Sequence, residues 1–159
     1  MSEYINYPLL IENSMRIVVK KAMQSFDDHY RNGKSCNHHF YISFLTNSYG
    51  VVLSERMQKK YPHEITIVLQ HQFEDLKIME EYFMVKLSFA GVKESIKVPF
   101  SAITSFTDPS VEFALQFNEI YQDYSAKKET NIIKETLENP KDDLKDMPNN
   151  VIQIDRFQK

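Results

Sequence analysis

The apolar residues near the start of the chain recur at the spacing of an α-helix. Between positions 8 and 30 they stand three or four residues apart, in the series Ile11, Met15, Val18, Ala22 and Phe26. Asn6 and Pro8 are residue types that often begin a helix, so we predict a helix over residues 8–30. Its apolar face is widened by Leu10, Ile17, Val19 and Met23. This wide face either covers a sheet or contacts a second copy of the chain in a homodimer.

Alternation of apolar and polar residues predicts several short strands after this helix. The predicted strands cover residues 38–46, 65–73, 83–89 and 96–98, and a last short strand ends near residue 117. Gly91 and the Asp108–Pro109 pair mark turns, and Pro99 ends a strand or marks a sheet edge. A short helix is predicted over residues 54–60. The pattern predicts an α+β, mainly β fold, in which the N-terminal helix packs on a small antiparallel barrel or sandwich.

The stretch ITIVLQHQF, residues 65–73, is predicted to be one continuous strand with two different faces. One face belongs to the core and carries Ile65, Ile67, Leu69, His71 and Phe73. The other face carries Val68 beside Gln70 and Gln72, which is neither an apolar core face nor a charged solvated one. Two interpretations stay open: the floor of a groove whose carboxamides hydrogen-bond to an extended peptide, or an ordinary solvated strand face.

The composition changes after residue 120. Residues 121–150 are rich in Asp, Glu and Lys and contain Pro140 and Pro148, which is typical of a flexible linker. Apolar residues return in the last nine positions, VIQIDRFQK. This ending is either a docking peptide on a charged tether or an extra strand that folds back onto the barrel. The predicted organisation is a folded domain over 1–120, a linker over 121–150 and a terminal peptide over 151–159.

Length, charge and cysteine content limit the function classes. The 159 residues suit one domain with an appendage. No apolar run is long enough to cross a membrane and the start shows no signal-peptide pattern, so we expect a cytoplasmic protein without a membrane partner. The net charge of −3 argues against nucleic acid as the main partner. The lone Cys36 excludes an internal disulfide and fits a reducing compartment.

Residue types that could carry catalysis or bind a metal are few. Cys36, His38 and His39 lie close together, but adjacent histidines on a strand point to opposite faces, which disfavours a shared metal. The chain has no phosphate-binding loop, no serine-hydrolase elbow and no zinc-protease motif. We therefore expect no catalytic residue, no cofactor and no metal. A small hydrolase that uses Cys36 or the histidines is the enzyme alternative.

Five segments of the chain together point to a known family. They are HHFYISFLT (38–46), YPHEITIVLQHQFEDL (61–76), VKLSFAG (85–91), VPFSAI (98–103) and FTDPSVEFALQF (106–117). In this order they resemble the alpha branch of the SspB family, stringent starvation protein B. The resemblance implies an adaptor for the ClpXP protease, which binds ssrA degradation tags and tethers tagged proteins to the ClpX unfoldase. It also implies an N-terminal helix on an SH3- or Sm-like barrel, a homodimer, and a disordered tail that ends in a ClpX-docking motif.

The resemblance also implies two groups of site residues. The tag peptide would bind at Val68, Gln70, His71, Gln72, Phe73, Lys86, Leu87 and Ser88. ClpX would bind the terminal residues Val151, Ile152, Ile154, Asp155, Arg156 and Phe157. This ending differs from the family pattern in having Ile154 where leucine is usual. An Sm-like RNA-binding protein is a further alternative, which would require a basic surface with stacking aromatic residues.

Overall fold

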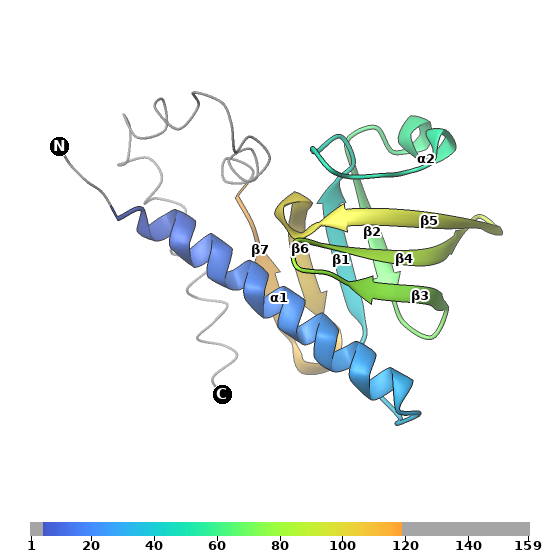
Figure 1. Ribbon diagram of the computed structural model, residues 1–159, viewed down its shortest axis with the longest axis horizontal. Coiled ribbons are helices and arrows are strands. Elements are labelled where there is room, and N and C mark those ends of the chain that lie inside the picture. The colour runs from blue at the N-terminus through green and yellow to red at the C-terminus, as the bar shows by residue number, and fades with distance from the viewer. Residues whose placement is uncertain (1–4, 119–159) are drawn as a thin grey trace.

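The computed structural model describes residues 5–118, which form a long helix and two antiparallel sheets (Figure 1). The helices are α1, Tyr7–Arg31, and α2, Glu55–Lys60, with short 3-10 helices η1, Phe100–Ala102, and η2, Pro109–Val111. The strands are β1 (Phe40–Leu45), β2 (Glu64–Leu69), β3 (Phe73–Ile78), β4 (Tyr82–Phe89), β5 (Val92–Pro99), β6 (Ile103–Asp108) and β7 (Phe113–Gln116). The predicted linker over 121–150 and the terminal peptide over 151–159 lie outside the described residues.

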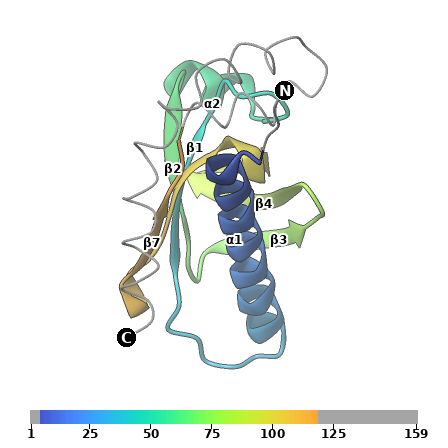
Figure 2. The same ribbon diagram turned by 90° about the vertical axis from the view of Figure 1, so that its left-hand side faces the viewer.

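The strands divide into a four-stranded sheet of order β2-β1-β6-β7 and a three-stranded sheet of order β3-β4-β5. The chain passes from one sheet to the other in the short turn between β2 and β3. Helix α1 runs past both sheets and packs against β3 and η1 (Figure 2). The prediction of an N-terminal helix on a small antiparallel β domain is confirmed. No helix in the described part is both long enough and apolar enough to cross a membrane.

Helix α1 begins and ends close to the predicted positions. The Asn6 side chain accepts a hydrogen bond from the Leu9 backbone N–H, and Pro8 lies in the first turn, where its missing N–H costs no hydrogen bond. The helix ends at Arg31 and is followed by Asn32, whose N–H bonds back to Asp28. Local sequence therefore explains both ends of this element.

The face that α1 turns to the core agrees with the predicted one only in part, because Met15 and Phe26 are buried as predicted but Val18 is not. Val19 and Met23, which we predicted to widen the apolar face, are both 0% exposed, whereas Val18 in the main apolar series is 46% exposed. Successive helical residues point about 100° apart, so packing that buries Val19 turns Val18 to the surface. Ile11 and Ala22 are only partly buried at the edge of the core. The exposed apolar residues of α1 are Tyr7, Leu10, Ile17, Val18 and Tyr30.

The prediction of one continuous strand over residues 65–73 is wrong. Strand β2 ends at Leu69 and β3 begins at Phe73 in the other sheet. Ile65, Ile67, Leu69 and Phe73 are buried as predicted, but His71 is exposed. The N–H of Gln72 bonds to the carbonyl of Gln70, and His71 between them has a φ of +23°. The two glutamines therefore belong to a tight turn and not to one strand face.

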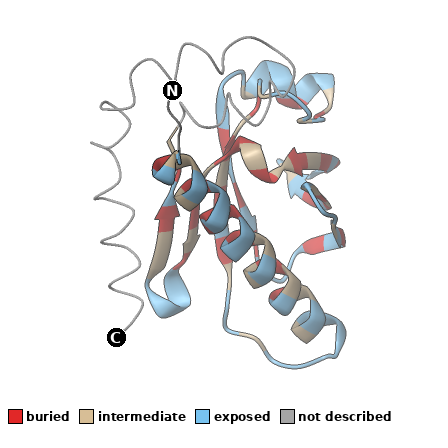
Figure 3. Cartoon of the chain, turned by 60° about the vertical axis from the view of Figure 1, so that its left-hand side comes forward, coloured by how far each residue is buried: buried red, intermediate tan, exposed pale blue. Residues whose placement is uncertain are grey.

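The other strand predictions hold, because each strand has one buried face. Along β1 and β4, buried residues alternate with exposed or half-buried ones. Figure 3 shows how far each described residue of the chain is buried. Phe40, Ile42 and Phe44 are buried in β1, and Phe83, Val85 and Leu87 are buried in β4. Ala90 and Gly91 join β4 to β5 with φ angles of +51° and +79°, as a two-residue hairpin loop of type I′ requires. Pro99 ends β5 as predicted, and Ser54 caps the predicted short helix α2.

Candidate functional site

A cavity of about 370 Å³ lies where the turn between β2 and β3 meets the three-stranded sheet. It is lined by His71, Gln72, Phe73, Glu74, Lys86, Leu87, Ser88 and Lys93. The strand register explains why these residues meet. Phe73 pairs with Leu87, Glu74 pairs with Lys86, and Ser88 pairs with Lys93, so three neighbouring strands contribute to one place.

Six of the eight residues predicted for tag binding line this cavity, namely His71, Gln72, Phe73, Lys86, Leu87 and Ser88. The other two do not line it. Val68 is in β2 of the other sheet, where it pairs with Tyr41, and Gln70 lies on the far side of His71. Both were assigned on the assumption of a continuous strand. Because the chain turns at His71, the residues before it do not continue the strand that the residues after it form.

Sequence reasoning missed two lining residues, Glu74 and Lys93. Glu74 follows Phe73 directly, so it enters the site once β3 is recognised as a separate strand. Lys93 could have been found by counting outward from the turn at Gly91. In a two-residue hairpin Phe89 pairs with Val92, and the next pair is therefore Ser88 with Lys93.

The cavity combines an apolar base with polar groups at its rim. Phe73 and Leu87 are buried, and His71, Gln72 and Ser88 are exposed. Exposed hydroxyl, imidazole and carboxamide groups can donate and accept hydrogen bonds from a bound molecule. The positive φ of His71 also marks a strained backbone, which is a feature that clusters at binding sites. The arrangement suits a ligand with both an apolar group and a polar chain.

The edge of β3 offers backbone groups beside this cavity. Within residues 5–118, β3 pairs with a strand only on its β4 side. Arg31, at the end of α1, donates a hydrogen bond of 2.9 Å to the carbonyl of Leu76 in β3. The end of α1 therefore meets this edge at Leu76, and Phe73 at the beginning of the edge contacts the rings of Phe26 and Tyr30 in α1 and also lines the cavity. An extended peptide can add to such an edge through main-chain hydrogen bonds.

Two ion pairs lie on the outer surface of the three-stranded sheet. The Lys93 Nζ is 2.6 Å from Glu74 Oε1, and the Lys86 Nζ is 2.9 Å from Asp75 Oδ2. The hydrogen bond and charge of Lys86 lower the pKa of Asp75, and the same contact raises the pKa of Lys86. Since these side chains are exposed to solvent, the pairs contribute little to stability and exchange readily.

A larger cavity of about 750 Å³ lies between α1 and the four-stranded sheet. Its lining is mainly apolar and includes Met15, Val18, Ala22, Phe26, Phe40, Phe106, Phe113 and Leu115. None of the residues predicted for tag binding lines it. One of its lining residues is Val18, which is also one of the exposed apolar residues of α1.

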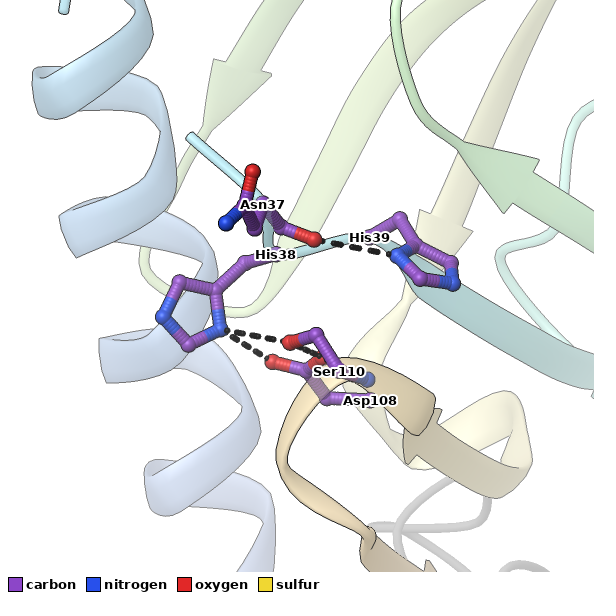
Figure 4. Close-up of polar contacts among 5 residues, drawn as sticks. All are labelled: Asn37, His38, His39, Asp108 and Ser110. Carbon is purple, nitrogen blue, oxygen red and sulfur yellow. Dashed lines mark hydrogen bonds and ion pairs between the residues drawn. The ribbon is translucent and has the colours of Figure 1, made fainter. Parts of the chain in front are cut away.

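A polar cluster at the rim of this larger cavity involves the histidines that raised the hydrolase alternative (Figure 4). His38 Nδ1 is 2.6 Å from Asp108 Oδ2 and 3.3 Å from Ser110 Oγ. In a catalytic triad the carboxylate and the hydroxyl contact different ring nitrogens, whereas here both lie on Nδ1. The Ser110 hydroxyl also donates to Asp108 Oδ1. This cluster ties the segment before β1 to η2 and does not resemble an activated nucleophile.

The neighbouring histidines point apart, as the sequence predicts. His39 lies away from His38 and its Nδ1 is 3.2 Å from the Asn37 carbonyl (Figure 4). Across residues 5–118, no group of three or more His, Cys, Asp or Glu side chains is placed to hold a metal ion.

Comparison with known protein families identifies a match. The family model described as stringent starvation protein B matches residues 9–153, which is most of the chain of 159 residues. No curated protein matches the sequence. The matched range includes all seven strands and both cavities. The chain therefore belongs to the stringent starvation protein B family, a family of protease adaptors.

Proposed function

We propose that this chain is a cytoplasmic adaptor that binds ssrA-type degradation tags and tethers tagged proteins to the ClpX unfoldase, so that ClpXP degrades them faster. One observation carries the proposal. Six residues expected from the family resemblance, which come from a turn and two strands, line a single cavity. Membership of the family supports an adaptor role in proteolysis.

The tag would bind as an extended peptide along the beginning of β3. Phe73 and Leu87 would accept an apolar side chain, and Gln72 and Ser88 would hydrogen-bond to the peptide. The free part of the β3 edge would add main-chain hydrogen bonds. This mode of binding suits an unfolded tag, because the tag has no fixed structure to recognise apart from its backbone and a few side chains.

Delivery would depend on the C-terminal part of the chain. We propose that Val151, Ile152, Ile154, Asp155, Arg156 and Phe157 bind ClpX and that residues 121–150 act as the tether. A flexible tether of about 30 residues has a root-mean-square span of roughly 30 Å. Such a span keeps the cargo near the unfoldase at about millimolar effective concentration. The adaptor then needs no catalytic residue of its own.

We also propose a homodimer formed through α1. Leu10, Ile17 and Val18 are exposed apolar residues on this helix, and Val18 borders the larger apolar cavity. A second copy that covers these residues would bury apolar surface that is now in contact with water. A dimer would carry two tag sites and two tails, which would strengthen its attachment to the unfoldase through multivalency.

A titration of the full chain with a fluorescently labelled ssrA peptide tests the proposal. We expect saturable binding that unlabelled ssrA peptide reverses and that a scrambled peptide of the same composition does not reverse. Equal binding of the scrambled peptide would mean that the site does not recognise the tag. Tight binding of a single-stranded RNA, without binding of the peptide, would favour the Sm-like alternative.

A further inference from the structure

Lysines and carboxylates lie together on the outer surface of the sheet beside the cavity of about 370 Å³. Three exposed lysines lie on β3, β4 and β5, namely Lys77, Lys86 and Lys93, and the half-buried Lys97 of β5 lies over the ring of Tyr82. Two acidic residues of β3, Glu74 and Asp75, lie among them. Two of the lysines, Lys86 and Lys93, line the cavity itself.

The two lining lysines are already held over the sheet by carboxylates. Lys93 in β5 reaches across β4 to Glu74 in β3, with 2.6 Å between Nζ and Oε1. Lys86 in β4 contacts Asp75 at 2.9 Å. All four side chains are exposed to solvent. The exposed fraction is 67% for Lys93 and 55% for Glu74 in the first pair. It is 46% for Lys86 and 61% for Asp75 in the second pair. Exposed pairs of this kind are weak, so a carboxylate from a ligand can replace the internal one.

The strand that carries Lys93 is fixed in position by α2. Arg56 of α2 contacts Glu94 at 3.0 Å and donates a hydrogen bond of 3.1 Å to the carbonyl of Phe89. These contacts hold both sides of the β4–β5 hairpin. Lys93 lies next to Glu94 and its cross-strand partner is Ser88, so its backbone is placed at the mouth of the cavity. A charge held on a rigid hairpin can discriminate between ligands better than a charge on a mobile loop.

We propose that Lys86 and Lys93 make this site selective for extended peptides that carry an acidic side chain next to the residue that occupies the apolar base. The inference rests on the proposed peptide-binding function and adds a rule of specificity to it. The ligand carboxylate would take the place of Glu74 or Asp75 on the lysine ammonium group. The same charge would attract acidic peptides during encounter, and salt would weaken this attraction.

Pairs of labelled peptides that differ by one charge test this inference on the full chain. Each position of the ssrA peptide is occupied in turn by Asp and by its uncharged isostere Asn, and the dissociation constants are compared at low and high salt. We expect at least one position at which Asp binds about two- to fivefold more tightly than Asn, the range that an exposed ion pair supplies. This preference should shrink as salt is added.

Lysine variants identify the groups responsible. The preference for Asp should be lost in Lys93→Gln or Lys86→Gln and should be kept in Lys93→Arg, which preserves the charge. Lys77→Gln is the matched control, because Lys77 is exposed on β3 of the same sheet but does not line the cavity. It changes the net charge equally and should leave the preference intact.

The outcomes separate this inference from the proposed function. If no peptide of the set binds the unmodified chain, the proposed function fails and the inference fails with it. If peptides bind but Asp and Asn are equivalent at every position, the selectivity is absent and the inference alone is overturned. The inference alone is also overturned if the preference for Asp survives in both Lys86→Gln and Lys93→Gln. It is likewise overturned if Lys77→Gln removes the preference as fully as those two variants do.

Discussion

Glu12, in the second turn of α1, accepts a hydrogen bond of 3.0 Å from the backbone N–H of Asn118, the last described residue. Arg16, one turn further along the helix, lies 4.4 Å from the centre of the Phe117 ring and donates to the carbonyls of Phe100 and Ile103. Burial lowers the pKa of Arg16 to about 10, in spite of the nearby Glu12 carboxylate. The first helix therefore holds Phe117 and Asn118, the last two residues that the structure describes.

Removing the Glu12 charge should destabilise the fold. Glu12 is 2% exposed and lies 3.9 Å from the Arg16 guanidinium, so Glu12→Gln would leave a buried cation with less compensation. Breaking a buried pair by removing one partner costs about 3–5 kcal/mol. We expect a large fall in Tm, measured by circular dichroism. Glu80→Gln is the control, since Glu80 pairs with Lys20 at the surface, and it should change Tm little. Equal Tm values for the two variants would contradict this assignment.

The turn between β2 and β3 allows a matched test of the tag site. Gln72 lines the cavity, whereas Gln70, two residues earlier, does not. Gln72→Ala should weaken ssrA peptide binding about two- to tenfold, the effect of one lost hydrogen bond of about 0.5–1.5 kcal/mol. Gln70→Ala should leave the affinity unchanged. Fluorescence anisotropy with labelled peptide measures the affinity of both variants. An equal loss of affinity in the two variants would mean that the cavity is not the tag-binding site.

The proposed dimer predicts different results for two neighbouring residues of α1. Val18→Glu places a charge on an exposed residue and should yield a folded monomer. Val19→Glu places an unpaired charge in the core and should prevent folding, because such burial costs several kcal/mol. Light scattering gives the mass and circular dichroism gives the fold. If the unmodified chain is monomeric at micromolar concentration, the exposed residues of α1 do not form a dimer contact.

These two residues also show where sequence reasoning reached its limit. The helical period identified α1 and its ends, because Asn6, Pro8 and the apolar spacing are local signals. It could not decide whether Val18 or Val19 faces the core, because apolar residues occur on both sides of the helix. That choice depends on the strands that α1 packs against. In the proposed dimer the exposed Leu10, Ile17 and Val18 are therefore the contact residues, and the buried Val19 and Met23 are not.

The same limit applies to residues 65–73. Alternation predicted buried Leu69 and Phe73 correctly, and it continued through His71 without interruption. A strand and a tight turn between two sheets can bury the same residues, so periodicity does not distinguish them. This turn contains neither Gly nor Pro. His71 adopts a positive φ, which a histidine in a sequence does not predict as a glycine would. The strands β1 and β4 were predictable because each alternates within a single sheet.

Acid should weaken the attachment of α2 to the β4–β5 hairpin. Hydrogen bonds from Ser54 and Arg56 lower the pKa of Glu94 below its ordinary 4.5. A carboxyl with a lowered pKa in the folded state contributes stability above its unfolded pKa and loses it as pH falls through the folded value. We expect Glu94→Gln to have a lower Tm than the unmodified chain at neutral pH. This difference should shrink as the pH falls below 4.5. A difference that stays constant would mean that the Glu94 charge is not responsible.

Truncation after Asn150 separates an adaptor from a plain binding protein. If residues 151–159 bind ClpX while the folded domain holds the tag, the truncated chain should bind ssrA peptide with unchanged affinity and unchanged Tm. It should no longer accelerate degradation of a tagged substrate by ClpXP. Phe157→Ala alone should cause much of this loss, because a buried aromatic anchor commonly contributes about 2 kcal/mol or more to a small interface. Gln153→Ala, in the same segment, changes a residue outside the proposed ClpX-binding set and serves as the comparison.

Two further measurements distinguish a docking tail from a tail that adds a strand to the folded domain. Moderate shortening of residues 121–150 should preserve delivery until the tether can no longer span the two sites, since the entropy of a flexible tether changes slowly with its length. If residues 151–159 instead add a strand to the folded domain, truncation should lower Tm and peptide affinity together. Both quantities are measured on one truncated protein, beside the degradation assay. A fall of many degrees in Tm with loss of tag binding would exclude the docking tail, because a tail that binds only ClpX contributes to neither quantity.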